Sequence, residues 1–290
     1  MNTMGSTEII SFYQDAYEDG RMEREPLEFI RCKEIISRYL SEEPMEIADI
    51  GGATGVFSFW LAAKGHNVHL LDFTPSHIQK AKEYGQSKNI SLASYDCCDA
   101  RALPYGDACF DLVLEMGPLY HLQGRGDRLS CLSEARRILR PGGMLLCEAI
   151  SRYAPLIDGF KQLLVDDEKF IGILDKDIET GLHSPGDTSY FTTSYLHTPE
   201  DIKGELADSG FGSVEIIAAE GFANALNSQQ LLGDGRISAL LLDYKKNRIR
   251  SRTAWGIQPS HCRDAQRAAM TAARRKGKDR GYAVPSGQKG

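Results

Sequence analysis

The sequence lacks long apolar runs, C-x-x-C pairs of cysteines and a basic, apolar leader, although Cys97 and Cys98 are adjacent. No run of about 18 apolar residues occurs, so we predict no membrane-spanning helix. Residues 1–20 are acidic and polar where a signal peptide would be basic and then apolar, so we expect a cytoplasmic protein. The seven cysteines form no C-x-x-C pair, and several lie in apolar runs, as reduced cysteines do. We therefore expect no metal site.

The charge is divided unevenly along the chain. Residues 245–290 carry 13 Lys and Arg against 2 Asp and Glu, whereas residues 1–244 carry 21 against 38. An acidic body does not favour nucleic-acid binding, although the basic tail by itself would. The length of 290 residues, with 42% hydrophobic and 26% charged residues, predicts one large domain with an elaboration.

The hydrophobic pattern alternates between the periods of helices and strands. Such alternation is typical of an α/β fold with a doubly wound, mostly parallel sheet. Residues 151–197 do not fit it, and we interpret them as a helical, aromatic cap insert whose aromatic residues form either the insert's own core or an acceptor pocket. We predict strands near 47–50, 67–72, 90–95, 110–116, 143–150 and 213–219, and helices near 26–40, 56–64, 76–87, 127–139 and 199–209.

A glycine turn follows the first predicted strand. Gly51, Gly52 and Gly55 let the backbone approach a ligand, because no Cβ stands in the way. Asp72 ends the next predicted strand, at the distance along the chain expected for a carboxylate that holds two ribose hydroxyls. Ligands of open α/β sheets bind at the carboxyl ends of the strands. The pattern therefore predicts a ribose-containing ligand.

Two cofactors fit this pattern: a dinucleotide and S-adenosylmethionine. The turn reads D-x-G-G-x-x-G and not G-x-G-x-x-G, and its acid, Asp49, would repel a pyrophosphate but attract an ammonium group. Here the chain resembles the class I S-adenosylmethionine-dependent methyltransferases, in their small-molecule branch. The resemblance covers about residues 45–220. Five motifs carry it in order: ADIGGATG, LLDFTP, YDCCDARALPY, FDLVLEMGPLYHL and RILRPGGMLLCEA.

The resemblance implies a role for each residue that matches a family motif. It implies that Asp49, Gly51 and Gly55 hold the methionine part of S-adenosylmethionine, and that Asp72 holds the ribose. Gly52 is a further cofactor-binding candidate, although Gly52-Ala53 departs from the G-x-G-x-G that is commoner in the family. Phe73 would lie against the adenine, Asp99 would accept its amino group, Ala100 would lend a backbone N–H, and Met116 would sit beside the sulfonium. The resemblance also implies methyl transfer to a small-molecule acceptor.

The acceptor must lose a proton, and His121 is the best-placed base. It lies in the G-P-L-Y-H loop after the fourth predicted strand, and the ordinary pKa of histidine suits proton transfer near neutral pH. Tyr120 and Tyr13 are the next candidates for a catalytic role. The alternative is that His121 only orients its loop. The acceptor atom and the oligomeric state are left open by the sequence.

Two other functions compete with this hypothesis. The basic tail could belong to a nucleic-acid methyltransferase or an RNA-binding module, but EMGP stands where an N/D-P-P-Y tetrapeptide would be expected. A nicotinamide-dependent oxidoreductase could use a similar sheet. We do not expect nucleic acid or a membrane as a partner.

We predict three segments: an N-terminal helical cap (1–44), the methyltransferase domain (45–220) and an irregular C-terminal segment (221–290) with a disordered basic tail. Nothing beyond Leu242 shows the period-2 alternation of a strand. The sheet would then lack its antiparallel seventh strand. Because a one-nucleotide shift from Asp243 can give a more family-like ending, we also hypothesise that this tail is a frame-shifted product.

Overall fold

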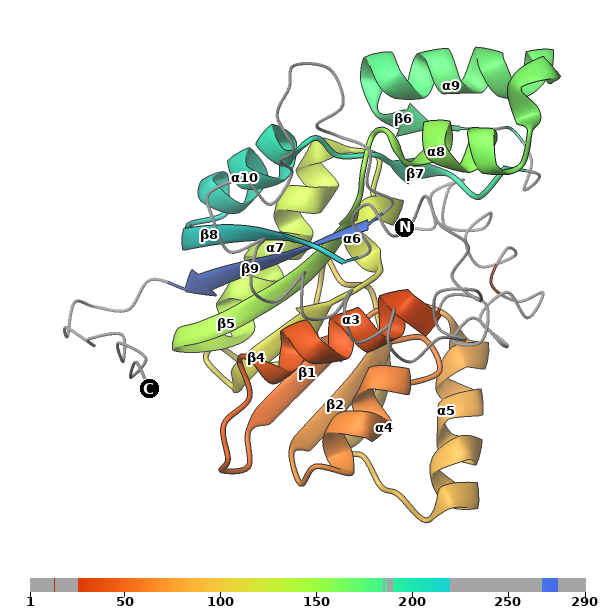
Figure 1. Cartoon of the computed structure of the whole chain (residues 1–290). Coiled ribbons are helices and arrows are strands. Elements are labelled where there is room, and N and C mark those ends of the chain that lie inside the picture. Colours follow the sequence, from red (N-terminus) through yellow and green to blue (C-terminus); the bar gives the residue numbers. More distant parts are fainter. Residues whose placement is uncertain (1–12, 14–25, 185, 187–189, 220–267, 276–290) are drawn as a thin grey trace, which may run out of the picture.

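A computed structural model describes residues 13, 26–184, 186, 190–219 and 268–275 (Figure 1). One seven-stranded sheet organises this part of the chain, in the order β3-β2-β1-β4-β5-β9-β8. The predicted α/β class with a mostly parallel sheet is confirmed. The strands are β1 Glu46–Ile50, β2 Asn67–Asp72, β3 Ser94–Cys97, β4 Phe110–Glu115, β5 Leu139–Ile150, β8 Phe211–Ala218 and β9 Ala268–Arg275.

Helices cover both faces of this sheet. On one face, α3 (Pro26–Ser37), α4 (Val56–Ala62) and α5 (Pro75–Lys88) bury apolar side chains against β1, β2 and β4. On the other face, α7 (Arg125–Ile138) and α10 (Pro199–Asp208) pack against β4, β5 and β8. The short helix α6 (Pro118–His121) follows β4. This two-sided packing explains why the central strands read as apolar runs, since both of their faces are buried.

The strand order reverses between β1 and β4. β1 pairs in parallel with β2 on one side and with β4 on the other, so the connections after these strands diverge to opposite faces. Such a switch point leaves a crevice at the carboxyl ends of the strands. The glycine turn after β1 and the loop after β4 therefore meet at one edge of the sheet.

The prediction that the sheet lacks its seventh strand is wrong. Residues 268–275 form β9, which pairs antiparallel with β5 on one side and β8 on the other. Met270 and Thr271 are fully buried. The segment A-A-M-T-A-A-R-R has few β-branched or aromatic residues, but two flanking strands satisfy its backbone groups. The predicted irregular segment 221–290 therefore contains a central strand, and its remaining residues lie outside the described part.

Two strands, β3 and β5, begin four residues away from their predicted positions. The third predicted strand, 90–95, is displaced to 94–97, because Asn89 ends α5 in the left-handed region and the Ile90 N–H donates to the Gly85 carbonyl. These residues close the helix and do not pair with β2. β5 begins at Leu139 and not at residue 143, because Leu139 already pairs with Phe110. The register then shifts across the R-P-G-G stretch before Met144 pairs with Leu112.

The 151–197 cap insert contains two helices and a small sheet. They are α8 (Ala154–Lys161), a 3₁₀ turn η1 (Leu164–Asp166), α9 (Glu168–Thr180), β6 (Leu182–His183) and β7 (Ser194–Tyr195). In Figure 1 the insert lies at the upper right, beyond the end of β5 that leads into α8. Phe170 and Leu174 are buried and supply part of its core. The predicted helical insert is confirmed.

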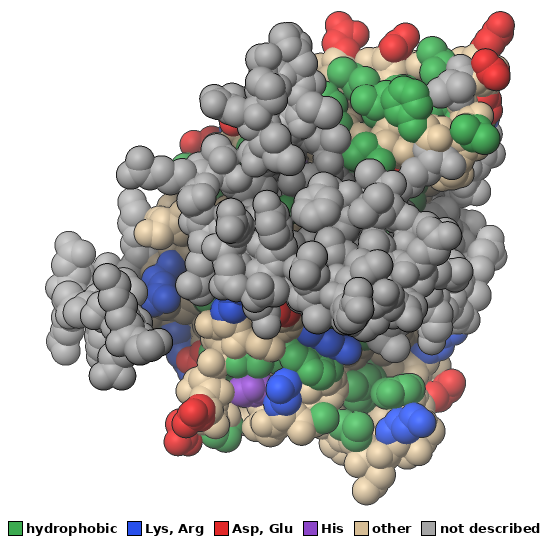
Figure 2. Space-filling model, viewed as in Figure 1, with side chains coloured by type: hydrophobic (Ala, Val, Ile, Leu, Met, Phe, Trp, Pro, Cys, Tyr) green, Lys and Arg blue, Asp and Glu red, His purple; other side chains and the backbone are tan. Residues whose placement is uncertain are grey.

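The surface of the cap insert carries exposed apolar groups. Phe160 and Leu163 are 62% and 79% exposed, and Figure 2 shows apolar side chains in this region with acidic side chains at its edge. Helix α3, in the predicted N-terminal cap, packs on a face of the sheet; residues 1–12 and 14–25 lie outside the described part. Among the described helices, none is long and apolar enough to span a bilayer.

Candidate active site

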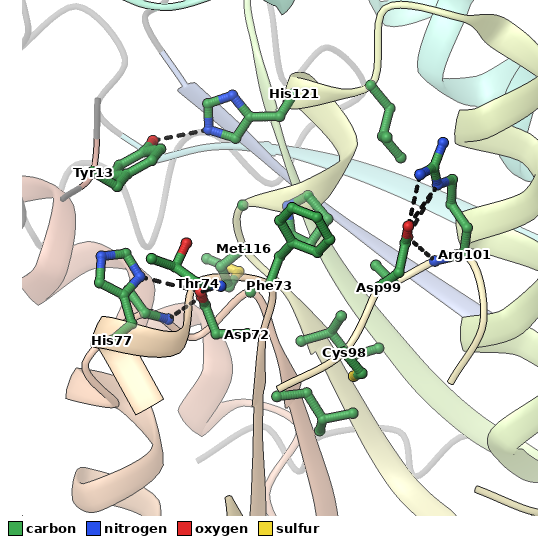
Figure 3. Close-up of a pocket in the computed structure, with 18 of the residues that line it drawn as sticks. Tyr13, Asp72, Phe73, Thr74, His77, Cys98, Asp99, Arg101, Met116 and His121 are labelled. Carbon is green, nitrogen blue, oxygen red and sulfur yellow. Dashed lines mark hydrogen bonds and ion pairs between the residues drawn. The ribbon is translucent and has the colours of Figure 1, made fainter. Parts of the chain in front are cut away.

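A pocket lies where the carboxyl ends of β1, β2 and β4 meet (Figure 3). Its walls come from the glycine turn, the start of α5, the loop after β3, the α6 region and Tyr13. Nine of the residues predicted for the site line it: Tyr13, Gly51, Asp72, Phe73, Asp99, Ala100, Met116, Tyr120 and His121. Asp49, Gly52 and Gly55 do not line it. Segments far apart in the sequence thus converge on one cavity.

The glycine turn forms the floor of the pocket at β1. Gly51 has a φ of 69°, and a Cβ added there would lie 2.4 Å from the Pro118 ring, so only glycine fits between the turn and α6. Gly55 has a φ of 87° where it precedes α4. A Cβ at Gly52 would lie 2.7 Å from the Asp49 carboxylate. The turn is therefore packed tightly against the loop after β4.

Asp49 lies one layer behind the pocket wall. Its side chain is fully buried, and Oδ2 accepts a 2.6 Å hydrogen bond from Ser58. Burial raises the pKa of Asp49 to about 6, although the hydrogen bond from Ser58 lowers it. Among the described residues, Oδ1 has no hydrogen-bond partner. A buried acceptor without a donor, next to a cleft, fits a cationic ligand group that binds directly or through water.

Asp72 is held by the backbone on two sides. Oδ2 accepts a hydrogen bond from the Ala53 N–H at 2.9 Å, and Oδ1 accepts one from the Thr74 N–H at 2.8 Å. His77 Nδ1 lies 3.1 Å from the same Oδ1. The carboxylate is 8% exposed and faces the pocket, as Figure 3 shows. The protein's own donors thus fix the orientation of this carboxylate.

The loop after β3 forms the opposite wall. Arg101 donates to both carboxylate oxygens of Asp99, and its Nη1 donates to Asp127 at 2.8 Å. Hydrogen bonds from Arg101 hold the pKa of Asp99 below its ordinary value. Burial raises the pKa of the Cys98 thiol to about 12, so this side chain is a neutral part of the wall. Arg101 therefore orients the Asp99 carboxylate and offsets its negative charge.

The other end of the pocket holds the candidate base. His121 Nε2 lies 2.8 Å from the Tyr13 hydroxyl, and Nδ1 lies 3.5 Å from the Thr193 carbonyl oxygen. A carbonyl oxygen can only accept a hydrogen bond, so Nδ1 carries the proton and donates it to Thr193. Nε2 then accepts a hydrogen bond from the Tyr13 hydroxyl. The Tyr120 hydroxyl is 3.5 Å from the Met116 carbonyl oxygen. His121 and Tyr13 thus form a pair, whereas Tyr120 points back to its own loop.

The cap insert reaches this end of the pocket through Phe191. Its ring stacks on His121 with centroids 6.0 Å apart, and its φ of 100° is rare for a residue with a side chain. Phe170 and Tyr190 pack together deeper in the insert, with ring centroids 5.6 Å apart. Both hypotheses for the insert's aromatic residues therefore have support: some form its core and one braces the candidate base.

The sequence did not reveal several residues that line the pocket. Thr74, His77, Cys98 and Arg101 all do so. The sequence did carry a signal for His77. The stretch T-P-S-H begins two residues after Asp72, and its Pro75 starts α5, so His77 lies in the first turn of that helix. Across the described ranges, no group of three or more His, Cys, Asp or Glu side chains has the arrangement of a metal site.

Comparisons with known proteins identify the family of this chain. A family model described as a methyltransferase domain matches residues 48–147. A ubiquinone/menaquinone biosynthesis C-methyltransferase of Pectobacterium carotovorum is 30% identical over 188 residues, covering 62% of this chain and 72% of that protein. A ubiquinone biosynthesis O-methyltransferase of Cereibacter sphaeroides is 31% identical over 117 residues, covering 40% and 46%. The chain spans less than half the length of some curated relatives that it matches.

The fold has a counterpart among solved structures. A methyltransferase of Methanosarcina mazei, described as S-adenosylmethionine-dependent, matches with a TM-score of 0.56 at 17% identity, covering 84% of this chain and 98% of that one. The chain belongs to the class I S-adenosylmethionine-dependent methyltransferases, as its motifs predicted. The cofactor of this family is S-adenosylmethionine.

Proposed function

We propose that this protein transfers a methyl group from S-adenosylmethionine to a small-molecule acceptor in the pocket at the β1/β4 switch point. One observation carries the proposal: the acids suited to a ribose and an adenine, Asp72 and Asp99, line the same cavity as the Tyr13–His121 pair. Methyl transfer to a substrate group that must lose a proton requires a cofactor site and a base in the same cavity.

The residues present fit the cofactor. Gly51 offers backbone without a Cβ, Asp49 keeps a buried carboxylate oxygen without a described partner, and Asp72 offers a fixed carboxylate. In this proposal they hold the methionine part and the ribose, with Gly52 and Gly55 shaping the turn. Asp99, Ala100 and Phe73 line the adenine end, and Met116 lines the sulfonium end.

When bound, the cofactor supplies a methyl group that is already activated by the positive sulfonium. The protein then has three tasks: to align the acceptor, to exclude water and to take the acceptor's proton. His121 is suited to the last task because Thr193 fixes its Nδ1 proton and leaves the Nε2 lone pair directed at the Tyr13 hydroxyl. An acceptor hydroxyl that takes the place of the Tyr13 hydroxyl would meet that lone pair.

The pocket favours an acceptor without a strong negative charge. Arg101 is the single Lys or Arg side chain in the described lining, and its guanidinium is paired with Asp99 and Asp127. An acidic acceptor would therefore compete with two carboxylates. The relatives named above are C- and O-methyltransferases of quinone biosynthesis, which supports an organic acceptor that loses a proton from carbon or oxygen.

Calorimetry tests the cofactor site. S-adenosylmethionine and its demethylated product should bind with micromolar-order affinity, and Asp72→Ala should weaken binding by about 2–4 kcal/mol, because a charged acceptor of hydrogen bonds is lost. Glu83→Ala, an exposed change on the same helix as His77, is the matched control and should bind like the parent. Unchanged affinity in Asp72→Ala would remove Asp72 from the site.

A screen with methyl-labelled cofactor tests the reaction. Metabolite extracts should yield labelled small molecules, which also identifies the acceptor. Total RNA in a parallel reaction examines the nucleic-acid alternative, and protection against heat by nicotinamide cofactors examines the oxidoreductase alternative. Label that appears only in RNA would overturn the small-molecule proposal.

A further inference from the structure

His77 is a buried histidine beside the acid proposed to hold the ribose. β2 ends at Asp72, Thr74 caps α5, and His77 lies in the first turn of that helix, 4% exposed. Its Nδ1 is 3.1 Å from Asp72 Oδ1, and Figure 3 shows the ring directed at this carboxylate. The histidine is therefore placed to act on the ligand through Asp72.

The acceptor positions of Asp72 are nearly all in use. A carboxylate offers about four lone-pair positions, two on each oxygen. Oδ1 faces two donors, the Thr74 N–H and His77 Nδ1, whereas Oδ2 faces the Ala53 N–H. Counting the donors in the described part of the chain, one position is left, and it belongs to Oδ2. A ribose that presents two hydroxyls would find room for one of them.

The hydrogen bonds also determine the tautomer of His77. Nδ1 must carry a proton to donate to Asp72. Nε2 is buried without a hydrogen-bond partner among the described residues, so a second proton there would be a buried donor without an acceptor. The ring therefore carries a proton at Nδ1. This donor fixes the carboxylate, whose negative charge makes its remaining position a strong acceptor for a hydroxyl.

We propose that His77 is a positioning residue that occupies Oδ1 of Asp72, so that the carboxylate binds a single ribose hydroxyl through Oδ2. The sequence predicted that Asp72 binds two ribose hydroxyls, so this inference differs from that prediction. The inference rests on the proposed function. His77 also meets the edge of the Tyr13 ring, with centroids 5.7 Å apart, so its variants must be checked for effects that pass through Tyr13.

Deoxy analogues of the demethylated product, S-adenosylhomocysteine, test on the unmodified protein whether Asp72 binds one ribose hydroxyl or two. One of the 2′-deoxy and 3′-deoxy analogues should bind about tenfold or more weaker than the parent ligand, and the other within about threefold, as expected for one hydrogen bond to a charged group. Similar large losses for both analogues would overturn the inference. No binding of S-adenosylhomocysteine at all would overturn the proposed function as well.

Substitutions of His77 test its role. His77→Leu should weaken S-adenosylhomocysteine binding about tenfold, whereas His77→Asn, whose amide nitrogen replaces Nδ1 as a donor, should recover most of the affinity. The loss in His77→Leu should vanish with the analogue that lacks the bound hydroxyl. A loss of the same size with every ligand would show that His77 acts on the fold or on Tyr13, and would contradict the proposed role.

Discussion

The hydroxyl of Tyr13 meets Nε2 of His121 at 2.8 Å, although the two residues are 108 positions apart in the sequence. The ring of Tyr13 also packs edge-on against His121, with centroids 5.4 Å apart. A residue of the N-terminal segment therefore contacts the nitrogen that, in the proposed reaction, takes the acceptor's proton.

His121→Ala should lower kcat about a hundredfold or more while the affinity for the cofactor stays unchanged, since in the proposed reaction the imidazole acts on the acceptor and not on the cofactor. The loss should be partly relieved at high pH if the acceptor is acidic. Tyr13→Phe should cost less, about tenfold, because the acceptor replaces its hydroxyl. Steady-state kinetics with calorimetry measures both. A fully active His121→Ala variant would return His121 to a structural role.

Glu115→Gln should stabilise the protein at alkaline pH. Glu115 is fully buried, accepts a hydrogen bond from the Cys131 thiol, and burial raises its pKa to about 7. Because the folded state holds this proton more tightly than the unfolded chain, stability falls as pH rises from about 4.5 to 7. The variant should gain little at pH 5 and about 3 kcal/mol at pH 8. Urea unfolding at both pH values measures it, and the exposed Glu83→Gln is the control.

Arg128→Met should destabilise the protein by about 3–5 kcal/mol, as expected when one partner of a buried ion pair is removed. Arg128 and Glu205 are almost completely buried and are joined by a 2.7 Å ion pair. Nη1 of Arg128 also donates to the Leu122 and Gln123 carbonyls, directly after His121. The double variant with Glu205→Leu should lose less than the sum of the two single losses. Additive losses in a double-mutant cycle would contradict the coupling.

Met270→Ala should cost about 2–5 kcal/mol, because Met270 is fully buried in β9 between two strands. Arg274→Ala, an exposed change in the same strand, should stay within about 0.5 kcal/mol of the parent. Chemical unfolding measures both. Equal, small effects would show that β9 does not join the sheet and would favour the frame-shift hypothesis, which the coding DNA tests directly.

The parts of the fold that could be predicted depend on local signals. Strand, glycine turn, helix, strand and acid follow one another from Glu46 to Asp72, and each has its own pattern of residues. The position of the cleft followed, because a parallel sheet of this kind brings the ends of β1, β2 and β4 together.

The remaining features depend on contacts that no local pattern encodes. β9 is rich in alanine and arginine, and it becomes a strand because β5 and β8 leave a gap that its backbone fills. His77 and Arg101 were overlooked because their importance lies in their contacts with Asp72 and Asp99, which depend on side-chain geometry. Asp49 was expected to attract the ligand directly or through water, and its position behind the glycine turn could not be predicted from the sequence.

The position of β9 in the chain has a consequence for protein synthesis. β5 and β8 can be joined only after the ribosome has made residues 268–275, whereas every described pocket residue lies at or before residue 122. Domains generally begin to fold from the N-terminal side as they are made. A nascent chain can therefore assemble its cofactor pocket while the edge of β5 is still open, and during that interval this edge can pair with a neighbouring nascent chain.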